Sequence, residues 1–185
     1  MSARKTTVVG VIFGGRSVEH DVSVVTGQQI MRAFPTERYE VVPLYIDREG
    51  RWFTGEPLTE LKTFQEDVRS VPGVLPVVLS PDVRQHGLIV NPLPSGLFAK
   101  PEARRLDVIF PAIHGSHGED GTLQGLFELA DLPYAGCGVL ASAIANDKWL
   151  SKQILKQNSV PVVDGLCFTR RQWEENPDAI LEQIK

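Results

Sequence analysis

The chain has 185 residues, a formal net charge of −4, 42% hydrophobic residues and 23% charged residues, so it can bury a sizeable core as one domain or as one domain with part of a second. The acidic balance leaves no basic stripe that could neutralise phosphates, so we expect no nucleic-acid partner. No apolar run approaches the roughly 20 residues that span a bilayer, so we expect no membrane partner. The two cysteines, Cys137 and Cys167, form no C-x-x-C motif and are typical of thiols in a reducing cytoplasm.

The first apolar run, residues 7–13 (TVVGVIF), predicts a buried strand rather than a signal peptide, because it is short and no small-x-small cleavage site follows. Residues 21–34 predict a helix that Pro35 closes. Its apolar residues fall on one broad face that could bury against a sheet or a partner: Val22, Val25, Ile30, Ala33 and Phe34. Residues 40–46 predict a second strand, in which Pro43 argues against a fully central position. This β-α-β order implies a parallel pair, and so an α/β fold with a parallel sheet flanked by helices.

Residues 51–105 have a different composition. Seven of the 13 prolines lie there, and they exclude a long helix. We interpret this segment as an irregular insertion with short strands at WFTG, VLPVVL and GLIVNP. An amphipathic stretch, residues 58–68, could form one short helix.

Regular patterns return after this insertion. Further strands are expected at 106–113, 133–136 and 165–169 (GLCFT). Further helices are expected at 122–130, 139–145, 146–158 and 172–184, the last interrupted at Pro177. Because the elements that begin near Val160 lack partners to bury their faces, we expect two domains: residues 1–145, and the incomplete start of a second domain at 146–185.

Residues 12–23 (IFGGRSVEHDVS) place charged side chains where a strand ends and a helix begins, a position where open α/β sheets often hold ligands. Neither G-x-G-x-x-G nor G-x-x-x-x-G-K-[ST] is present, and Glu19 and Asp21 would repel a phosphate. Glu19 suits a cationic group such as an ammonium. In the alternative interpretation, Asp21 or Ser17 caps the helix and Glu19 interacts only with the helix dipole.

Residues 113–122 (IHGSHGEDGT) also follow a buried strand, so they should stand on the same rim of the sheet. A metal site would be one interpretation, but His114 and His117 are three apart in a glycine-rich loop and no H-E-x-x-H is present. His114 is better placed to donate a hydrogen bond to a substrate carboxylate. Asp120 could cap the following helix, with Glu119 adding a favourable charge at its start.

Lys148 opens the helix predicted after Asn146 and Asp147. A lysine at a helix N-terminus opposes the macrodipole by roughly 0.3–1 kcal/mol, and an anionic ligand would offset that cost. A solvated lysine beside Asp147 is the alternative.

In this order, GGRSVEHDVS, HGSHGEDGTLQG and LPYAGCGVLASAIANDK resemble the D-alanine–D-alanine ligases of the ATP-grasp superfamily. The H-G-x-x-G-E-D-G-T-[LI]-Q-G segment is the most specific part of the resemblance. The resemblance implies a Rossmann-like N-terminal domain followed by the start of an ATP-grasp domain. It also implies a cytoplasmic homodimeric enzyme of peptidoglycan synthesis that joins two D-alanines through an acylphosphate with ATP and Mg²⁺. A complete ligase of this family is roughly twice as long, so most ATP contacts and the magnesium ligands would lie outside this chain.

The resemblance also implies roles for individual residues. Glu19 matches a catalytic-site glutamate that holds the ammonium of the first D-alanine, and His114 matches the histidine at that substrate's carboxylate. Ser17 and Val18 precede Glu19 in the same substrate-binding frame. Lys148 matches a lysine that reaches toward ATP. His20 and Asp21 match variable positions, so their roles stay open.

Two other functions remain compatible with these residues. One is a D-alanine–D-lactate or D-alanine–D-serine ligase, which differs in its second substrate. The other is a non-catalytic α/β module that binds an amino acid or dimerises.

Overall fold

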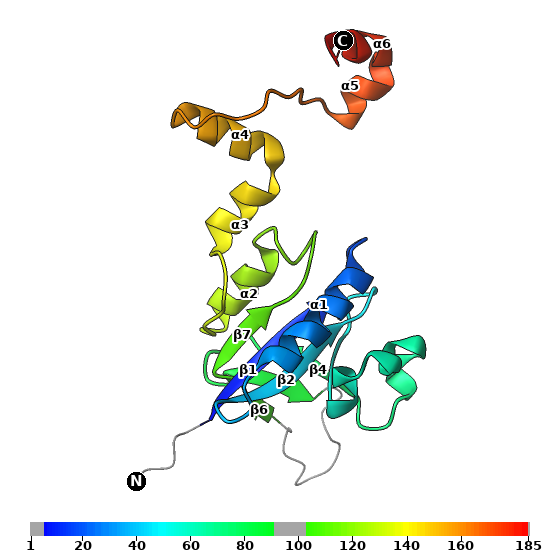
Figure 1. Ribbon diagram of the computed structural model, residues 1–185, viewed down its shortest axis with the longest axis vertical. Helices are drawn as coiled ribbons and strands as arrows, with labels where there is room; N and C mark the ends of the chain where they lie inside the picture. Colours follow the sequence, from blue (N-terminus) through cyan, green and yellow to red (C-terminus); the bar gives the residue numbers. More distant parts are fainter. Residues whose placement is uncertain (1–5, 91–102, 185) are drawn as a thin grey trace. The chain divides into compact units, whose positions relative to one another are not determined.

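The computed structural model describes residues 6–90 and 103–184 of the chain (Figure 1). The strands are β1 (Thr7–Gly14), β2 (Tyr39–Ile46), β3 (Trp52–Thr54), β4 (Leu75–Leu79), β5 (Gly87–Val90), β6 (Ala103–Arg105) and β7 (Val108–Pro111). The helices are α1 (His20–Ala33), α2 (Thr122–Leu129), α3 (Val139–Asn146), α4 (Lys148–Gln157), α5 (Arg170–Glu175) and α6 (Pro177–Ile184). The chain divides into two compact units, Met1–Ala143 and Ile144–Lys185.

The strands of the first unit form one sheet in the order β6-β5-β4-β3-β2-β1-β7. The pairs β1–β2 and β1–β7 are parallel, which confirms the predicted α/β fold. The pairs from β2–β3 to β5–β6 are antiparallel, so the sheet is mixed. The predicted insertion therefore extends the same sheet instead of standing apart from it.

Helices cover both faces of the parallel part of this sheet. Successive side chains of a strand point to opposite faces. On one face, Val24 and Met31 of α1 pack with a cluster that includes Phe13 of β1. On the other face, Leu123 and Phe127 of α2 pack with a cluster drawn from β1, β2 and β7. Both clusters stay within the first unit, so the parallel strands are fixed from both sides.

The buried face of α1 matches the predicted one only in part: Ile30 and Phe34 pack against the core cluster, but other predicted residues do not. Val22 and Val25 are 58% and 43% exposed. The buried residues are His20, Ser23, Val24, Gly27, Gln28 and Met31. The approach to the sheet is close, because a Cβ on Gly27 would lie only 2.6 Å from Cγ of Phe13. The polar residues on this face can be buried because they form hydrogen bonds to groups outside α1, and hydrophobic periodicity does not reveal such pairing.

The strands predicted in the insertion are confirmed as β3, β4 and β5, although residues 91–92 of GLIVNP lie outside the described residues. Instead of one helix at 58–68 there are three short 3₁₀ turns, η1 (Glu56–Thr59), η2 (Leu61–Gln65) and η3 (Val68–Ser70). Pro43 lies in β2, inside the sheet, against the expectation for a proline. It is tolerated because the β2–β3 pairing begins only at Leu44, so no ladder bond to β3 is lost at Pro43.

The C-terminal part contains the predicted helices but not all of the predicted strands. Residues 133–136 contribute only one bridge, between Tyr134 and Ile109 of β7. Residues 165–169 form no strand, because no described strand pairs with them. The last helix is split at Pro177 into α5 and α6, as expected. None of the described helices combines the length and apolar character needed to cross a membrane.

Candidate functional site

The candidate site lies where β1 and β7 end side by side. Both strands run in the same direction, so the loops that follow them leave the sheet at the same edge. The first loop, residues 15–19, leads into α1. The second loop, residues 112–121, leads into α2. The structure thus brings together the two motifs that the sequence analysis placed on one rim.

The glycine pair allows the first loop to turn directly over the sheet edge. Gly14 and Gly15 have φ angles of +89° and +96°, a backbone conformation that other residues adopt only with strain. A Cβ on Gly14 would lie 2.2 Å from the carbonyl oxygen of Ile46. The N–H of Gly15 donates to that same oxygen at 2.8 Å. The turn therefore needs glycine for conformation and for space.

Two serines bind the two loops together. The Ser17 hydroxyl donates to the carbonyl of His114 at 2.8 Å and accepts from the N–H of Glu19 at 3.1 Å. The Ser23 hydroxyl, fully buried, donates to the carbonyl of Ala112 at 2.6 Å and accepts from the N–H of Gly14 at 2.8 Å. These bonds fix the start of the second loop against the first.

Glu19 and His114 belong to the two loops that meet at this junction. Glu19 is the N-cap residue of α1, its side chain makes no capping hydrogen bond, and the residue is exposed. Its Oε2 atom would lie 2.7 Å from a Cβ on Gly115, so the carboxylate stands directly beside the residue after His114. The ring of His114 is half-buried, and its Nε2 lies 3.0 Å from the Thr26 hydroxyl of α1. One carboxylate and one imidazole thus stand at a single sheet edge.

The carboxylates of the second loop hold the loop itself. Asp120 accepts from the N–H of Thr122 at 3.1 Å and from the N–H of His117 at 2.8 Å. The N-cap residue of α2 is Gly121, so Asp120 stands one residue before the predicted cap position. Burial acts to raise the pKa of Asp120, but the hydrogen bonds from Thr122 and His117 outweigh it and hold the pKa below its usual value. Glu119 accepts from the N–H of Gly115 at 2.7 Å.

The two histidines of this loop point to different partners. The His117 ring accepts from the Arg16 guanidinium at 3.4 Å, whereas the His114 ring contacts Thr26. Within residues 6–90 and 103–184, no three His, Cys, Asp or Glu side chains gather as a metal site would require. The described loops therefore offer hydrogen bonds and charge to a ligand.

The remaining predicted residues are all exposed. Val18 is 100% exposed at the tip of the first loop. Lys148, in the second unit, is the first residue of α4, and the Asp147 side chain caps that helix by accepting from the N–H of Leu150 at 2.9 Å. The sequence analysis did not anticipate Thr26 or Ser23. Their spacing from Glu19, seven and four residues along α1, is the one signal that could have suggested them.

Comparisons with known proteins identify the family of the chain. A family model described as "D-ala D-ala ligase N-terminus" matches residues 8–137. The D-alanine–D-alanine ligase of Geobacillus thermodenitrificans is 37% identical over 184 residues, covering 97% of this chain and 47% of the relative. That of Streptomyces griseus is 40% identical over 187 residues, covering 98% of this chain and 47% of the relative.

Solved structures give the same result. The chain superimposes on the VanG D-Ala:D-Ser ligase of Enterococcus faecalis with a TM-score of 0.75 and 29% identity, covering 97% of this chain and 49% of that one. The D-alanine–D-alanine ligase of Coxiella burnetii gives a TM-score of 0.75 and 28% identity, with 96% and 50% covered. The chain spans about half the length of the relatives that it matches. Its sequence, sheet and paired loops together show that it belongs to the D-Ala–D-Ala ligase N-terminus family.

Proposed function

We propose that this chain provides the binding site for the first D-alanine of an ATP-dependent D-alanine–D-alanine ligase, a carbon–nitrogen ligase of peptidoglycan synthesis. The observation that carries the proposal is the Ser17–His114 hydrogen bond of 2.8 Å, which joins the loops of Glu19 and His114 at one sheet edge. An amino acid needs an anionic partner for its ammonium and a donor for its carboxylate. Glu19 and His114 are such a pair.

In this proposal, Glu19 holds the ammonium of the first D-alanine. Pairing with a carboxylate favours the protonated amine, so that this amine cannot act as the nucleophile. His114 orients the substrate carboxylate toward the phosphoryl donor, and Thr26 fixes the ring through Nε2. Ser17 holds the two loops in register, and Val18 offers an exposed apolar side chain to the bound substrate.

ATP supplies the phosphoryl group that converts the first D-alanine's carboxylate to an acylphosphate. Of the predicted ATP contacts, only Lys148 lies in this chain, and it is an exposed cation at a helix start, which fits an anionic ligand. The described residues gather no metal ligands, so we assign no Mg²⁺ contact to them. We also propose that residues 1–145 form the substrate-binding domain, that 146–185 open the ATP-grasp domain, and that the enzyme is a cytoplasmic homodimer.

A second candidate function is a D-alanine–D-serine or D-alanine–D-lactate ligase. One of the similar structures is a D-Ala:D-Ser ligase, and the same first-substrate site would serve all three reactions. A non-catalytic module that binds an amino acid is a third candidate. Product analysis with D-alanine, D-serine and D-lactate as second substrates distinguishes these candidates.

The test uses this chain joined to the C-terminal half that its relatives carry, called the completed ligase. Glu19→Gln and His114→Asn should each raise the KM for the first D-alanine by roughly ten- to a hundredfold, since each removes a charged or hydrogen-bonded contact worth about 1.5–3 kcal/mol. Matched controls are Glu37→Gln and His86→Asn, which alter residues outside both loops of the site. Unchanged KM values in both site variants would overturn the proposal.

A further inference from the structure

We infer that His20 and Tyr45 form a buried positioning pair that sets the place of Glu19 at the substrate. The inference rests on the proposed function, because it assigns these residues an effect on first-substrate binding. Neither residue touches the proposed substrate contacts of Glu19 or His114, so both would act through the first loop.

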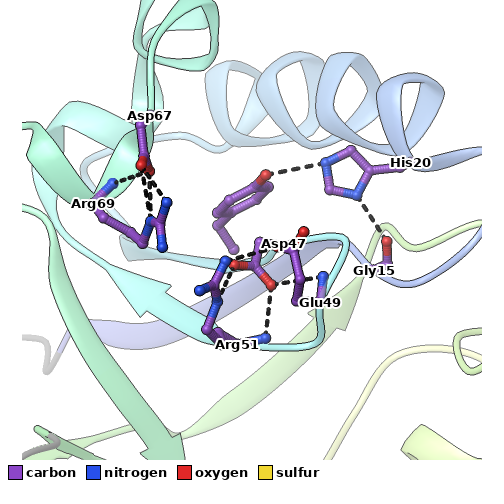
Figure 2. A network of polar contacts seen from close by, with 8 residues as sticks. Gly15, His20, Asp47, Glu49, Arg51, Asp67 and Arg69 are labelled. Atoms are coloured by element: carbon purple, nitrogen blue, oxygen red, sulfur yellow. Dashed lines mark hydrogen bonds and ion pairs between the residues drawn. The ribbon is translucent and has the colours of Figure 1, made fainter.

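His20 is only 4% exposed, and both of its ring nitrogens have partners. Nδ1 lies 2.7 Å from the carbonyl oxygen of Gly15, and Nε2 lies 3.1 Å from the Tyr45 hydroxyl. Figure 2 shows the contact between His20 and Gly15 as a dashed line. A carbonyl oxygen can only accept, so Nδ1 must carry the proton. In the neutral ring Nε2 then accepts from Tyr45. The arrangement thus selects one tautomer of His20.

Tyr45 is held in place by its surroundings. It is 7% exposed near the end of β2, and its ring packs against those of Phe13 and Phe64 at centroid distances of 5.7 and 5.0 Å. The rings of Tyr45 and His20 meet edge to face at 5.6 Å. A hydroxyl fixed by so many aromatic contacts holds the imidazole in one orientation.

The oriented His20 ring acts on the loop that carries Glu19 through its hydrogen bond to Gly15. The N–H of Gly15 donates to Ile46, and its carbonyl accepts from His20, so both peptide groups at the start of the loop are held. Glu19 directly precedes His20, and its side chain has no capping bond to hold it. His20 therefore closes the loop from Gly15 to Glu19 into a ring whose geometry decides where the Glu19 carboxylate points.

The first experiment measures steady-state kinetics of the completed ligase. His20→Ala should raise the KM for the first D-alanine roughly three- to tenfold, the effect of one lost hydrogen bond, with little change in kcat. His20→Asn should restore most of the affinity, because its amide N–H can donate to Gly15. Tyr45→Phe should raise the same KM less than His20→Ala. Met31→Ala is the control for simple destabilisation, since it empties a buried site farther along α1 and should leave the KM unchanged.

A double-mutant cycle tests the route through Glu19. In a Glu19→Gln background, His20→Ala should cause no further rise in KM. A full additive rise would overturn the inference while leaving the proposed function intact, as would a His20→Ala effect confined to kcat. If Glu19→Gln itself does not change the KM, Glu19 does not hold the ammonium, and the inference fails with that part of the proposed function.

A spectroscopic readout covers the case in which His20→Ala does not fold. The ¹⁵N chemical shifts of the His20 ring in the unaltered chain should show that Nδ1 carries a proton. In Tyr45→Phe this preference for Nδ1 should weaken. A ring protonated only at Nε2 in the unaltered chain would overturn the inference.

Discussion

At the scale of single residues, the site depends on side chains that bind backbone more than on side chains that bind each other. Ser17 of the first loop and Ser23 of α1 each donate to a carbonyl of the second loop, at 2.8 and 2.6 Å. Residues 17 and 114 are far apart in sequence, yet this one hydrogen bond fixes their separation in space. Glu19 and His114 remain available for a ligand because their neighbours hold the loops.

The buried hydroxyl of Tyr45 predicts a specific loss of stability in alkali. Burial raises the pKa of Tyr45 to about 12, and the nearby Asp47 carboxylate adds to the rise. The folded state therefore holds this proton more tightly than the unfolded state does. Its contribution to the free energy of unfolding is fully present below about pH 10. As the pH rises through 12, the free energy of unfolding falls by up to about 2–3 kcal/mol.

Urea unfolding of the unaltered chain and of Tyr45→Phe from pH 8 to 12 checks this expectation. The free energy of unfolding should fall more steeply for the unaltered chain above pH 10, because only that chain carries the buried phenol. Parallel curves for the two proteins would show that Tyr45 titrates normally.

At the scale of elements, the sequence patterns predict the parallel strands and α1 but only part of the face that α1 buries. A β-branched run such as TVVGVIF has few alternatives to a buried strand, so β1 was predictable. The buried face of α1 carries Ser23, Gln28 and His20. Most of their hydrogen-bond partners lie in other elements of the fold. Residues 165–169 have the composition of a strand, but no described strand pairs with them. Composition alone does not show whether a partner strand is present.

The start of α4 carries the next prediction. Lys148→Ala in the completed ligase should raise the KM for ATP roughly tenfold, because an ammonium facing phosphate is lost, and should leave D-alanine affinity nearly unchanged. In the chain itself, the free energy of unfolding should stay the same or rise by a few tenths of a kcal/mol, since a cation opposing the helix dipole is removed.

Lys152→Ala, one turn farther along α4, is the matched control and should alter neither KM. If the KM for ATP does not change in Lys148→Ala, then Lys148 is a solvated surface residue. A stability loss above about 1 kcal/mol would show instead that Lys148 has a structural partner.

At the scale of the whole molecule, the sheet assembles the site. The order β2-β1-β7 places two loops, about 95 residues apart in sequence, at adjacent strand ends. The two motifs could therefore be assigned to one rim from strand and helix patterns alone. The hydrogen bonds of Ser17, Thr26 and His20 could not, because they depend on the register between strands and on the rotation of α1.

The claim that Glu19 holds the ammonium and His114 the carboxylate of the first D-alanine is tested most directly with a substrate analogue. Propionate keeps the carboxylate of D-alanine but lacks the ammonium. The measurement is the inhibition constant of propionate beside the KM for the first D-alanine, in the completed ligase and in its Glu19→Gln and His114→Asn variants.

Glu19→Gln should raise the KM for the first D-alanine by roughly tenfold or more and leave the inhibition constant of propionate unchanged, because propionate offers Glu19 no cation. His114→Asn should weaken both ligands by similar factors, because both carry the carboxylate. If Glu19→Gln weakens propionate as much as D-alanine, or affects neither, then Glu19 does not hold the ammonium and the assignment of this site is wrong.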